Sequence, residues 1–380
     1  MKSRTIFLVA FLLIAVTWSA SAQNFSVDAS VGLLYDFNSS QVLFAQQADD
    51  EWIPASLVKV MTMYVALDRI AADNVALDTE VVVSERAWRM GGSQMFLEVG
   101  DRVTLEDLLY GIAVVSGNDA CVAIAEALAG TESLFIQWMS NKAKELGLNL
   151  HFVDVHGLSE DNRITARDFA ILIENYLRDH PEALQYHSRL SFGYQPRSSS
   201  SPIVQSNRNG LLRTYEGADG LKTGFLSKAG NNLTATAKRD GRRLIAIVLG
   251  ADSEAKREQE AAKLLDYGFR SFESIHMDEL LSEQEVKVYK GRSKSVELTV
   301  DTSVSFLRGS REQLNTVVII DELEAPIEAG EKVGTISVYL EDELLKEAPI
   351  LAAQSVERGG WFTVLIDSII LFFKKLFSQA

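Results

Sequence analysis

Apolar and polar residues alternate in two parts of the chain that lie far apart in the sequence. Alternation over residues 27–35 leads into a turn-forming run at 36–40, and a second alternating pair, 233–237 and 244–249, flanks a turn at 239–242. Alternation on both sides of a short polar turn is typical of a β-hairpin. We therefore predict two hairpins, one near each end of a first domain.

Helical spacing replaces the alternation between these hairpins. Residues 56–72 are apolar nearly all round, so a helix there should be buried. Further helical runs cover 105–110 and 120–128, and Thr165 begins a capping sequence before the apolar run 169–172. Strands at both ends with helices between them predict a mixed α+β domain whose antiparallel sheet is completed by both ends of the segment.

Short alternating strands separated by turns dominate the chain after residue 276. A helix over 256–272 would close the first domain before them. We predict a first domain over 23–275 and a small all-β domain over 276–355. The second domain would be a spacer that holds the first one off a surface or, alternatively, a binding unit for a peptide or polymer.

The first residues have the pattern of a secretion signal. Lys2 and Arg4 precede an apolar run over 6–16, and small residues follow at 20–22. We predict a signal peptide over 1–22, so the mature protein would begin at Gln23 and be exported.

The last residues predict an amphipathic helix over 356–380. On a helical wheel the polar residues gather on one side and the large apolar residues on the other. Asp367 divides the apolar run into two stretches, each far too short to cross a bilayer. We expect this helix to lie in a membrane interface as an anchor, the alternative being a terminal helix docked on the protein.

Composition narrows the classes of partner. A formal net charge of −15 argues against nucleic acid and against a polybasic attachment to anionic lipid. A single cysteine, Cys121, cannot form an internal disulfide. His151, Asp154 and His156 lie close in sequence, but no third imidazole or cysteine cluster accompanies them, so we predict no metal and no cofactor.

Three short motifs in fixed order carry the chemistry. They are Ser56-Leu57-Val58-Lys59, Ser116-Gly117-Asn118 and Lys222-Thr223-Gly224. A second S-x-x-K at 253–256 stands alone in a charged stretch, which shows that one motif by itself is weak evidence. The ordered set is typical of an enzyme that forms an acyl-serine intermediate.

The residue types fit that reaction. A serine hydroxyl is a poor nucleophile unless a base lies beside it, and Lys59 follows Ser56 by one helical turn. Lysine acts as a base only if its pKa falls, which burial and a second cation, Lys222, would favour. We expect Ser116 to relay a proton and Asn118 to hold a substrate carbonyl and restrain Lys59.

The third motif suits substrate binding. Lys222 and Thr223 could hold a substrate carboxylate, and Gly224 would let a substrate backbone approach the strand closely. The backbone N–H groups of Ser56 and Phe225 would form the oxyanion hole.

The chain resembles a known family. The resemblance rests on these motifs, on the sequences 155–158 and 207–212, on the β domain and on the terminal helix. It resembles the low-molecular-mass penicillin-binding proteins that are D-alanyl-D-alanine carboxypeptidases. The resemblance implies a penicillin-binding, serine β-lactamase-like transpeptidase domain on the periplasmic face of the bacterial inner membrane. It implies that Ser56 is acylated by the penultimate D-alanine of a peptidoglycan stem peptide and by β-lactams. By the same resemblance Arg243 would help bind the terminal carboxylate and Arg208 would support the site.

One position departs from the family's commonest pattern, because histidine often follows the third motif there and Phe225 stands here. A D,D-endopeptidase acting on cross-links and a β-lactamase remain alternatives within the enzymes, although no deacylating glutamate is found by motif. A non-catalytic peptidoglycan-binding module is the alternative outside them, and the intact motifs argue against it.

Overall fold

The computed structural model describes residues 25–377. The predicted signal peptide over 1–22 and the predicted start at Gln23 lie outside the described residues.

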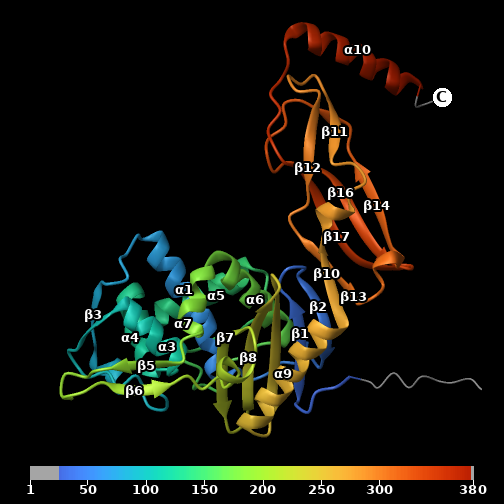
Figure 1. Cartoon of the computed structure of the whole chain (residues 1–380). Coiled ribbons are helices and arrows are strands. Elements are labelled where there is room, and N and C mark those ends of the chain that lie inside the picture. Colours follow the sequence, from blue (N-terminus) through green and yellow to red (C-terminus); the bar gives the residue numbers. More distant parts are fainter. Residues whose placement is uncertain (1–24, 378–380) are drawn as a thin grey trace, which may run out of the picture.

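A five-stranded antiparallel sheet forms the centre of the first part of the chain, in the order β2-β1-β9-β8-β7 (Figure 1). Its first hairpin ends at Gln46 and its last three strands begin at Ala218, yet β1 pairs with β9 from Val31 against Leu249 to Asp36 against Leu244. The strands are β1 (Val31–Asp36), β2 (Gln41–Gln46), β7 (Ala218–Leu226), β8 (Gly230–Arg239) and β9 (Arg242–Ala251). Both predicted hairpins are thus found in one sheet.

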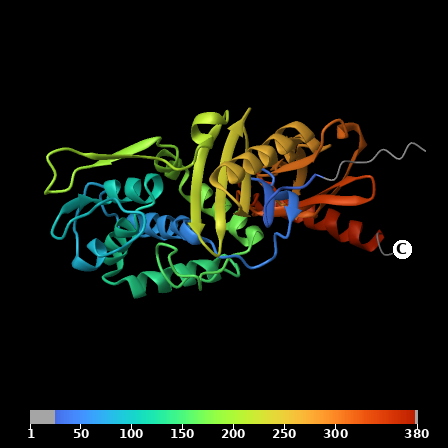
Figure 2. The same ribbon diagram turned by 90° about the horizontal axis from the view of Figure 1, so that it is seen from below.

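Each face of this sheet packs against helices, with neighbouring strand residues pointing to opposite sides. Leu33 belongs to the core shared with the helical cluster, whereas Leu34 belongs to the core under α9 (Glu254–Ser271). Figure 2 shows α9 on one face and the helical cluster on the other. The longer helices of that cluster are α1 (Val58–Ala72), α3 (Leu105–Val114), α4 (Asn118–Ala129), α5 (Glu132–Glu145) and α6 (Ala166–Asp179).

Short elements complete the first part. Two small hairpins pair β3 (Glu80–Val82) with β4 (Arg102–Thr104) and β5 (Ser191–Tyr194) with β6 (Ile203–Ser206). The short helices are η1 (Ala55–Leu57), α2 (Glu85–Trp88), η2 (Pro181–Ala183), α7 (Leu184–His187) and α8 (Leu211–Thr214).

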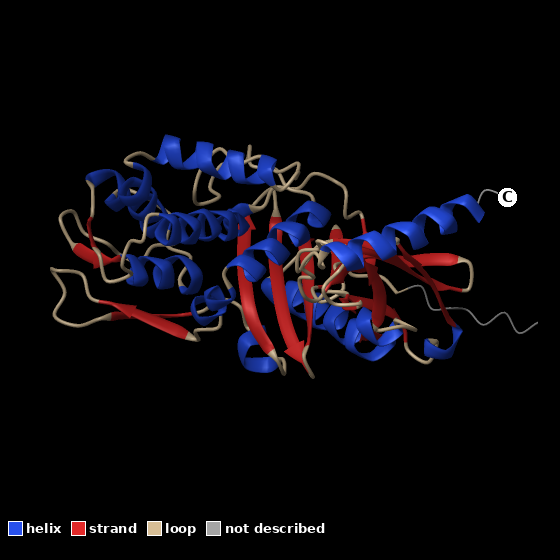
Figure 3. Cartoon of the chain, turned by 90° about the horizontal axis from the view of Figure 1, so that it is seen from above, coloured by secondary structure: helices blue, strands red, loops and turns tan. Residues whose placement is uncertain are grey.

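The second part is built of strands around its own buried core, which runs from Ile275 to Val356 (Figure 3). A six-stranded sheet has the order β14-β16-β17-β12-β11-β15, and β10 pairs with β13. The elements of the second part are β10 (Phe272–His276), η3 (Met277–Leu280), β11 (Glu285–Tyr289), β12 (Ser295–Thr299), β13 (Ser303–Leu307), η4 (Arg311–Gln313), β14 (Leu314–Ile320), β15 (Leu323–Glu324), β16 (Lys332–Leu340) and β17 (Glu343–Ala352). An α+β domain followed by an all-β one is confirmed.

Polar contacts join the two parts where β1 ends. The buried carboxylate of Asp36 accepts a hydrogen bond from Arg242 Nε at 2.7 Å and another from Ser305 Oγ at 2.7 Å. Gln41 Nε2 donates to the backbone oxygens of Ser305 and Leu345. Strand residues of both parts therefore meet in a hydrogen-bonded joint.

The terminal helix α10 (Trp361–Phe377) lies at the end of the β-rich part that is farther from the first part (Figure 1). Its polar side faces the protein, because the buried Asp367 accepts a hydrogen bond from the backbone N–H of Lys290 at 2.6 Å. Leu371 is buried, whereas most of the helix's other large apolar side chains point outward, with Trp361 exposed to 78% and Phe377 to 73%. Within residues 25–377, no helix has the length and apolar character needed to cross a membrane.

Candidate active site

A cleft lies between the edge strand β7 and the helical cluster. It brings together residues of all three motifs with two arginines and a loop that follows α5. Its walls are formed by Ser56, Gly92, Ser93, Ser116, Asn118, Gly157, Leu158, Arg208, Thr223, Gly224, Phe225, Glu254 and Arg257.

Lys59 is the centre of the polar contacts at the base of this cleft. Its ammonium is fully buried and donates to Ser56 Oγ at 3.0 Å, Asn118 Oδ1 at 2.8 Å and the backbone oxygen of His156 at 2.5 Å. Ser56 lies in η1 and Lys59 in the first turn of α1, so the spacing of three places both on one side of the turn. Each of the three ammonium protons of Lys59 therefore has a hydrogen-bond acceptor.

Burial sets the proton affinity of Lys59. Desolvation lowers the pKa of Lys59, and the positive charge of Arg208 acts in the same direction. Asp154 and Asp119 oppose this by raising it. The Cys121 thiol adds no charge at neutral pH, because burial raises the pKa of Cys121 to about 12.

Ser116 and Asn118 enter the cleft from the start of α4. Ser116 has a φ of 61°, a left-handed conformation that is uncommon for residues other than glycine. Ser116 Oγ is buried and has no hydrogen-bond partner among residues 25–377, so it is free to contact a reacting group. Asn118 Nδ2 donates to the backbone oxygen of Gly91 at 2.7 Å, which leaves its second proton for a ligand.

Lys222 lies on β7 beneath the cleft wall. Its Nζ is buried and donates to the backbone oxygen of Thr223 at 3.1 Å. Burial, reinforced by the charges of Lys59 and Arg208, holds the pKa of Lys222 well below its ordinary value. Thr223, Gly224 and Phe225 line the cleft, whereas Lys222 is not among the cleft-lining residues.

The backbones of Gly224 and Gly157 both lie close to the turn that carries Ser56. A Cβ on Gly224 would lie 2.8 Å from the oxygen of Pro54 and 3.1 Å from Ser56 N. A Cβ on Gly157, which has a φ of 84°, would lie 1.9 Å from the oxygen of Ala55. Gly224 was expected to make room for a substrate backbone, and here it makes room for the nucleophile turn itself.

The two arginines expected from resemblance lie in different places. Arg208 lines the cleft. Arg243 is instead held by Asp219 through two hydrogen bonds of 2.7 Å, and it is not among the cleft-lining residues. In its place the structure brings Arg257 of α9 to the cleft, with Nη2 donating to the backbone oxygen of Arg208 at 3.3 Å. Sequence reasoning missed Arg257, because no local motif surrounds it.

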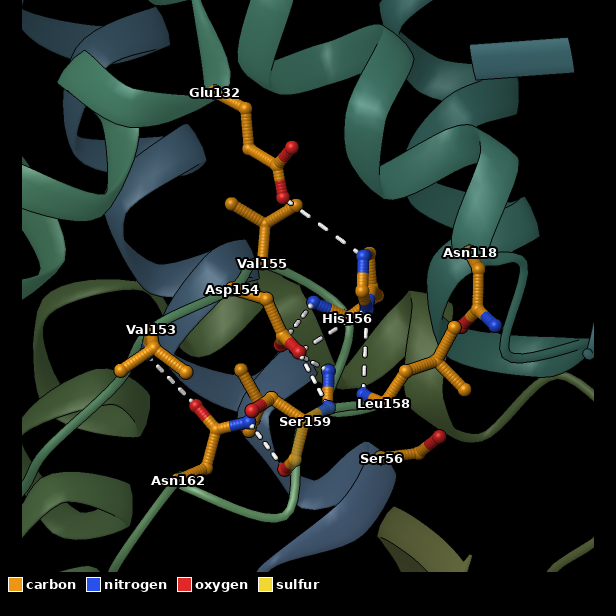
Figure 4. Close-up of polar contacts among 12 residues, drawn as sticks. Ser56, Asn118, Glu132, Val153, Asp154, Val155, His156, Leu158, Ser159 and Asn162 are labelled. Carbon is orange, nitrogen blue, oxygen red and sulfur yellow. Dashed lines mark hydrogen bonds and ion pairs between the residues drawn. The ribbon is translucent and has the colours of Figure 1, made fainter. Parts of the chain in front are cut away.

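The loop over 154–159 contains the sequence 155–158 that counted toward the resemblance, but sequence reasoning assigned it no role in the site (Figure 4). Asp154 Oδ1 accepts from the backbone N–H of His156 at 3.1 Å and of Gly157 at 2.5 Å, and Oδ2 accepts from Ser159 N–H at 2.7 Å. Asp154 and His156 are thus occupied within this loop. No group of three metal-ligating side chains is found in the described part of the chain.

Comparison with known proteins identifies the family of the chain. The family model described as D-alanyl-D-alanine carboxypeptidase matches residues 17–253, and the model of the C-terminal domain of penicillin-binding protein 5 matches residues 269–358. The Escherichia coli protein D-alanyl-D-alanine carboxypeptidase DacC is 38% identical over 93% of this chain and 90% of its own length.

Solved structures show the same fold. Penicillin-binding protein 5 from Haemophilus influenzae superposes with a TM-score of 0.77 at 32% identity, covering 88% of this chain and 98% of that one. Penicillin-binding protein D2 from Listeria monocytogenes, solved in its ampicillin-bound form, has a TM-score of 0.58 at 29% identity and covers 65% of this chain and 99% of that one. The predicted family, fold and enzyme class are confirmed, and the chain belongs to the D-alanyl-D-alanine carboxypeptidase family of serine peptidases.

Proposed function

We propose that this cleft removes the terminal D-alanine from peptidoglycan stem pentapeptides through an acyl-enzyme on Ser56. The observation that carries the proposal is the 3.0 Å contact between Ser56 Oγ and a buried lysine whose pKa is lowered by burial. Neutral Lys59 takes the proton of Ser56 as Oγ attacks the carbonyl carbon of the penultimate D-alanine. The backbone N–H groups of Ser56 and Phe225 stabilise the oxyanion.

Collapse of the tetrahedral intermediate breaks the peptide bond. Ser116, whose hydroxyl is otherwise unpartnered, passes a proton from the lysine pair to the departing amine of the terminal D-alanine. Water then attacks the ester carbonyl, with the same groups returning the proton to Ser56 Oγ. Asn118 keeps Lys59 directed at Ser56 throughout.

The terminal carboxylate of the substrate is assigned to Thr223 with Arg208 and Arg257. Both arginines and Thr223 line the cleft, and guanidinium groups bind carboxylates through paired hydrogen bonds. Lys222 Nζ is not part of the cleft lining and donates to the backbone oxygen of Thr223, so it is assigned to holding Thr223 in place. Arg243 does not enter the assignment, because Asp219 holds its guanidinium.

β-Lactams are expected to acylate the same serine. The ampicillin-bound structure of the Listeria monocytogenes relative supports this. Brief exposure to a labelled penicillin, followed by mass spectrometry, should find one adduct on Ser56 and none in Ser56→Ala. A folded protein without an adduct would exclude the acyl-enzyme.

The test of the function is release of free D-alanine from a pentapeptide stem, with Ser56→Ala as control. Release that depends on Ser56 supports a carboxypeptidase. Cleavage of cross-linked stems without release from the pentapeptide would identify an endopeptidase, and rapid turnover of penicillin alone would identify a β-lactamase. Peptide binding with no turnover would indicate a binding module.

The remaining parts of the chain are proposed to place this cleft on a membrane outside the cytoplasm. After a signal over 1–22, the first domain over 23–275 would work at the periplasmic face, the β domain over 276–355 would be a spacer, and the segment 356–380 would attach to the membrane surface. The outward-facing apolar side chains of α10 support this attachment.

A further inference from the structure

The loop over 154–159 contacts both the base and the nucleophile turn. The backbone oxygen of His156 accepts the shortest of the three hydrogen bonds from Lys59 Nζ. One residue later, Gly157 has no room for a Cβ against the backbone of Ala55, which precedes Ser56. A displacement of this loop would therefore misdirect Lys59 and press on Ser56 at once.

A single carboxylate holds this loop in shape. Asp154 is 7% exposed and accepts three backbone hydrogen bonds, from His156, Gly157 and Ser159. Those N–H groups lie next to the carbonyl that Lys59 contacts, and Figure 4 shows them converging on Asp154. A carboxylate that accepts several backbone N–H groups fixes their directions strongly.

The His156 ring completes the support without reaching the cleft. Leu158 N–H donates to its Nδ1 at 3.3 Å, and the same Nδ1 lies 3.5 Å from Asp154 Oδ2, while Nε2 lies 3.8 Å from Glu132 Oε1. Burial lowers the pKa of His156, which keeps it neutral. Because His156 is neutral, the charged group of this loop that acts on Lys59 is the Asp154 carboxylate.

We propose that Asp154 is a positioning residue for acyl transfer, which holds the His156 carbonyl on Lys59 and places a carboxylate close to this base. The proposal rests on the proposed role of Lys59 as the base for Ser56. It deepens that function by assigning a residue outside the three motifs, one that touches no substrate.

Removal of the Asp154 charge has a definite sign. Among the charged groups that act on Lys59, Arg208 lowers its pKa, whereas Asp154 and Asp119 raise it. Asp154→Asn removes one anion and also loosens the carbonyl that accepts from the protonated amine. Both changes favour the neutral lysine, so the pKa of Lys59 falls further.

The experiment measures the rate constant of Ser56 acylation by penicillin against pH in the full chain. For Asp154→Asn we expect the plateau of the rate constant to be about 10- to 100-fold lower, because Lys59 is less well directed at Ser56. We also expect the acidic limb of the pH profile, where the rate constant rises with pH, to move to lower pH by about 0.5 to 1 unit. A merely structural role would reduce the fraction of protein acylated and leave the limb where it is. Asp161→Asn is the matched control, since Asp161 is an exposed carboxylate two residues beyond this loop.

The outcomes separate the two proposals. No Ser56 adduct in the wild type would overturn the acyl-enzyme itself. An adduct in the wild type, with Asp154→Asn equal to Asp161→Asn in plateau and limb, would overturn the role of Asp154. If Asp154→Asn does not fold, Asn162→Ala takes its place, because Asn162 Nδ2 donates to Ser159 O at 3.0 Å and its loss loosens the loop while leaving the carboxylate. A plateau below that of Asp161→Asn then supports the proposal, and an equal one refutes it.

Discussion

Arg257 donates a hydrogen bond to the backbone oxygen of Arg208, which brings two guanidinium groups from distant parts of the chain to one cleft. Arg257 is 1% exposed, its Nε has no partner among residues 25–377, and its nearest carboxylate is Glu254 at 3.6 Å. A buried cation so weakly paired is costly unless an anion completes its surroundings. The substrate carboxylate is the anion that the proposed reaction supplies.

Arg257→Met should therefore weaken the use of peptides that end in a free carboxylate. We expect kcat/KM for D-alanine release to fall about 10- to 100-fold, since a hydrogen bond to a charged group contributes about 1.5–3 kcal/mol. Arg270→Met is the control, because Arg270 lies on the same helix and is exposed. A loss of the same size in Arg243→Met, with Arg257→Met unaffected, would place the carboxylate at Arg243 instead.

Lys222 should reduce stability at neutral pH. Its pKa is lowered in the folded protein, so the unfolded chain binds more protons between the folded and the unfolded pKa, and the free energy of unfolding rises with pH through that window. Lys222→Met removes this cost. We expect denaturant titration to find the variant more stable than the wild type at pH 7, by about 1 kcal/mol or more.

The same titration at higher pH checks the cause. The advantage of Lys222→Met should shrink as the pH approaches about 10.4, where the unfolded lysine also loses its proton. Lys332→Met, at an exposed lysine, should show no such trend. An advantage that stays constant with pH would assign it to packing.

Phe225 offers a test of deacylation. Its side chain is 59% exposed and lines the cleft, while the oxyanion role needs only its backbone N–H. Phe225→His should leave acylation by penicillin within about twofold and change the rate of adduct hydrolysis by about tenfold, because an imidazole adds a proton-transfer group beside the ester. Single-turnover mass spectrometry separates the two rates, and an altered acylation rate alone would contradict the assignment.

Removal of the terminal helix should release the protein from lipid. Truncation after Gly359 should abolish sedimentation with vesicles, since it removes the exposed apolar side chains of α10. Phe362→Glu combined with Phe373→Glu keeps the helix and should act in the same way. Vesicle binding that survives both changes would place the lipid contact elsewhere, and D-alanine release should be unaltered throughout.

Local patterns in the sequence predicted the elements whose partners lie nearby. Alternation was enough for the hairpin that ends in β2 and the hairpin of β8 and β9, and a spacing of three was enough to place Lys59 beside Ser56. The side of α10 that would contact the protein was less evident, because Asp367 is buried through tertiary contacts with the Lys290 backbone and the Lys294 ammonium.

Arg257 and Asp154 could not be assigned in this way. Arg257 reaches the cleft because α9 packs on the sheet, which depends on contacts between segments far apart in the chain. Asp154 matters through three backbone N–H groups whose directions exist only in the folded loop. The resemblance suggested Arg243 for the carboxylate, and its pairing with Asp219 is likewise a tertiary contact.

The close approach of Gly157 and Gly224 to the turn before Ser56 has a consequence for engineering. Backbone atoms on both sides, rather than side chains, fix where the nucleophile stands. Cleft-lining side chains such as Leu158 and Phe225 can therefore be substituted to alter which peptides bind, without moving Ser56. A methyl group added at either glycine would instead displace the reactive atom, even with every other cleft-lining residue unchanged.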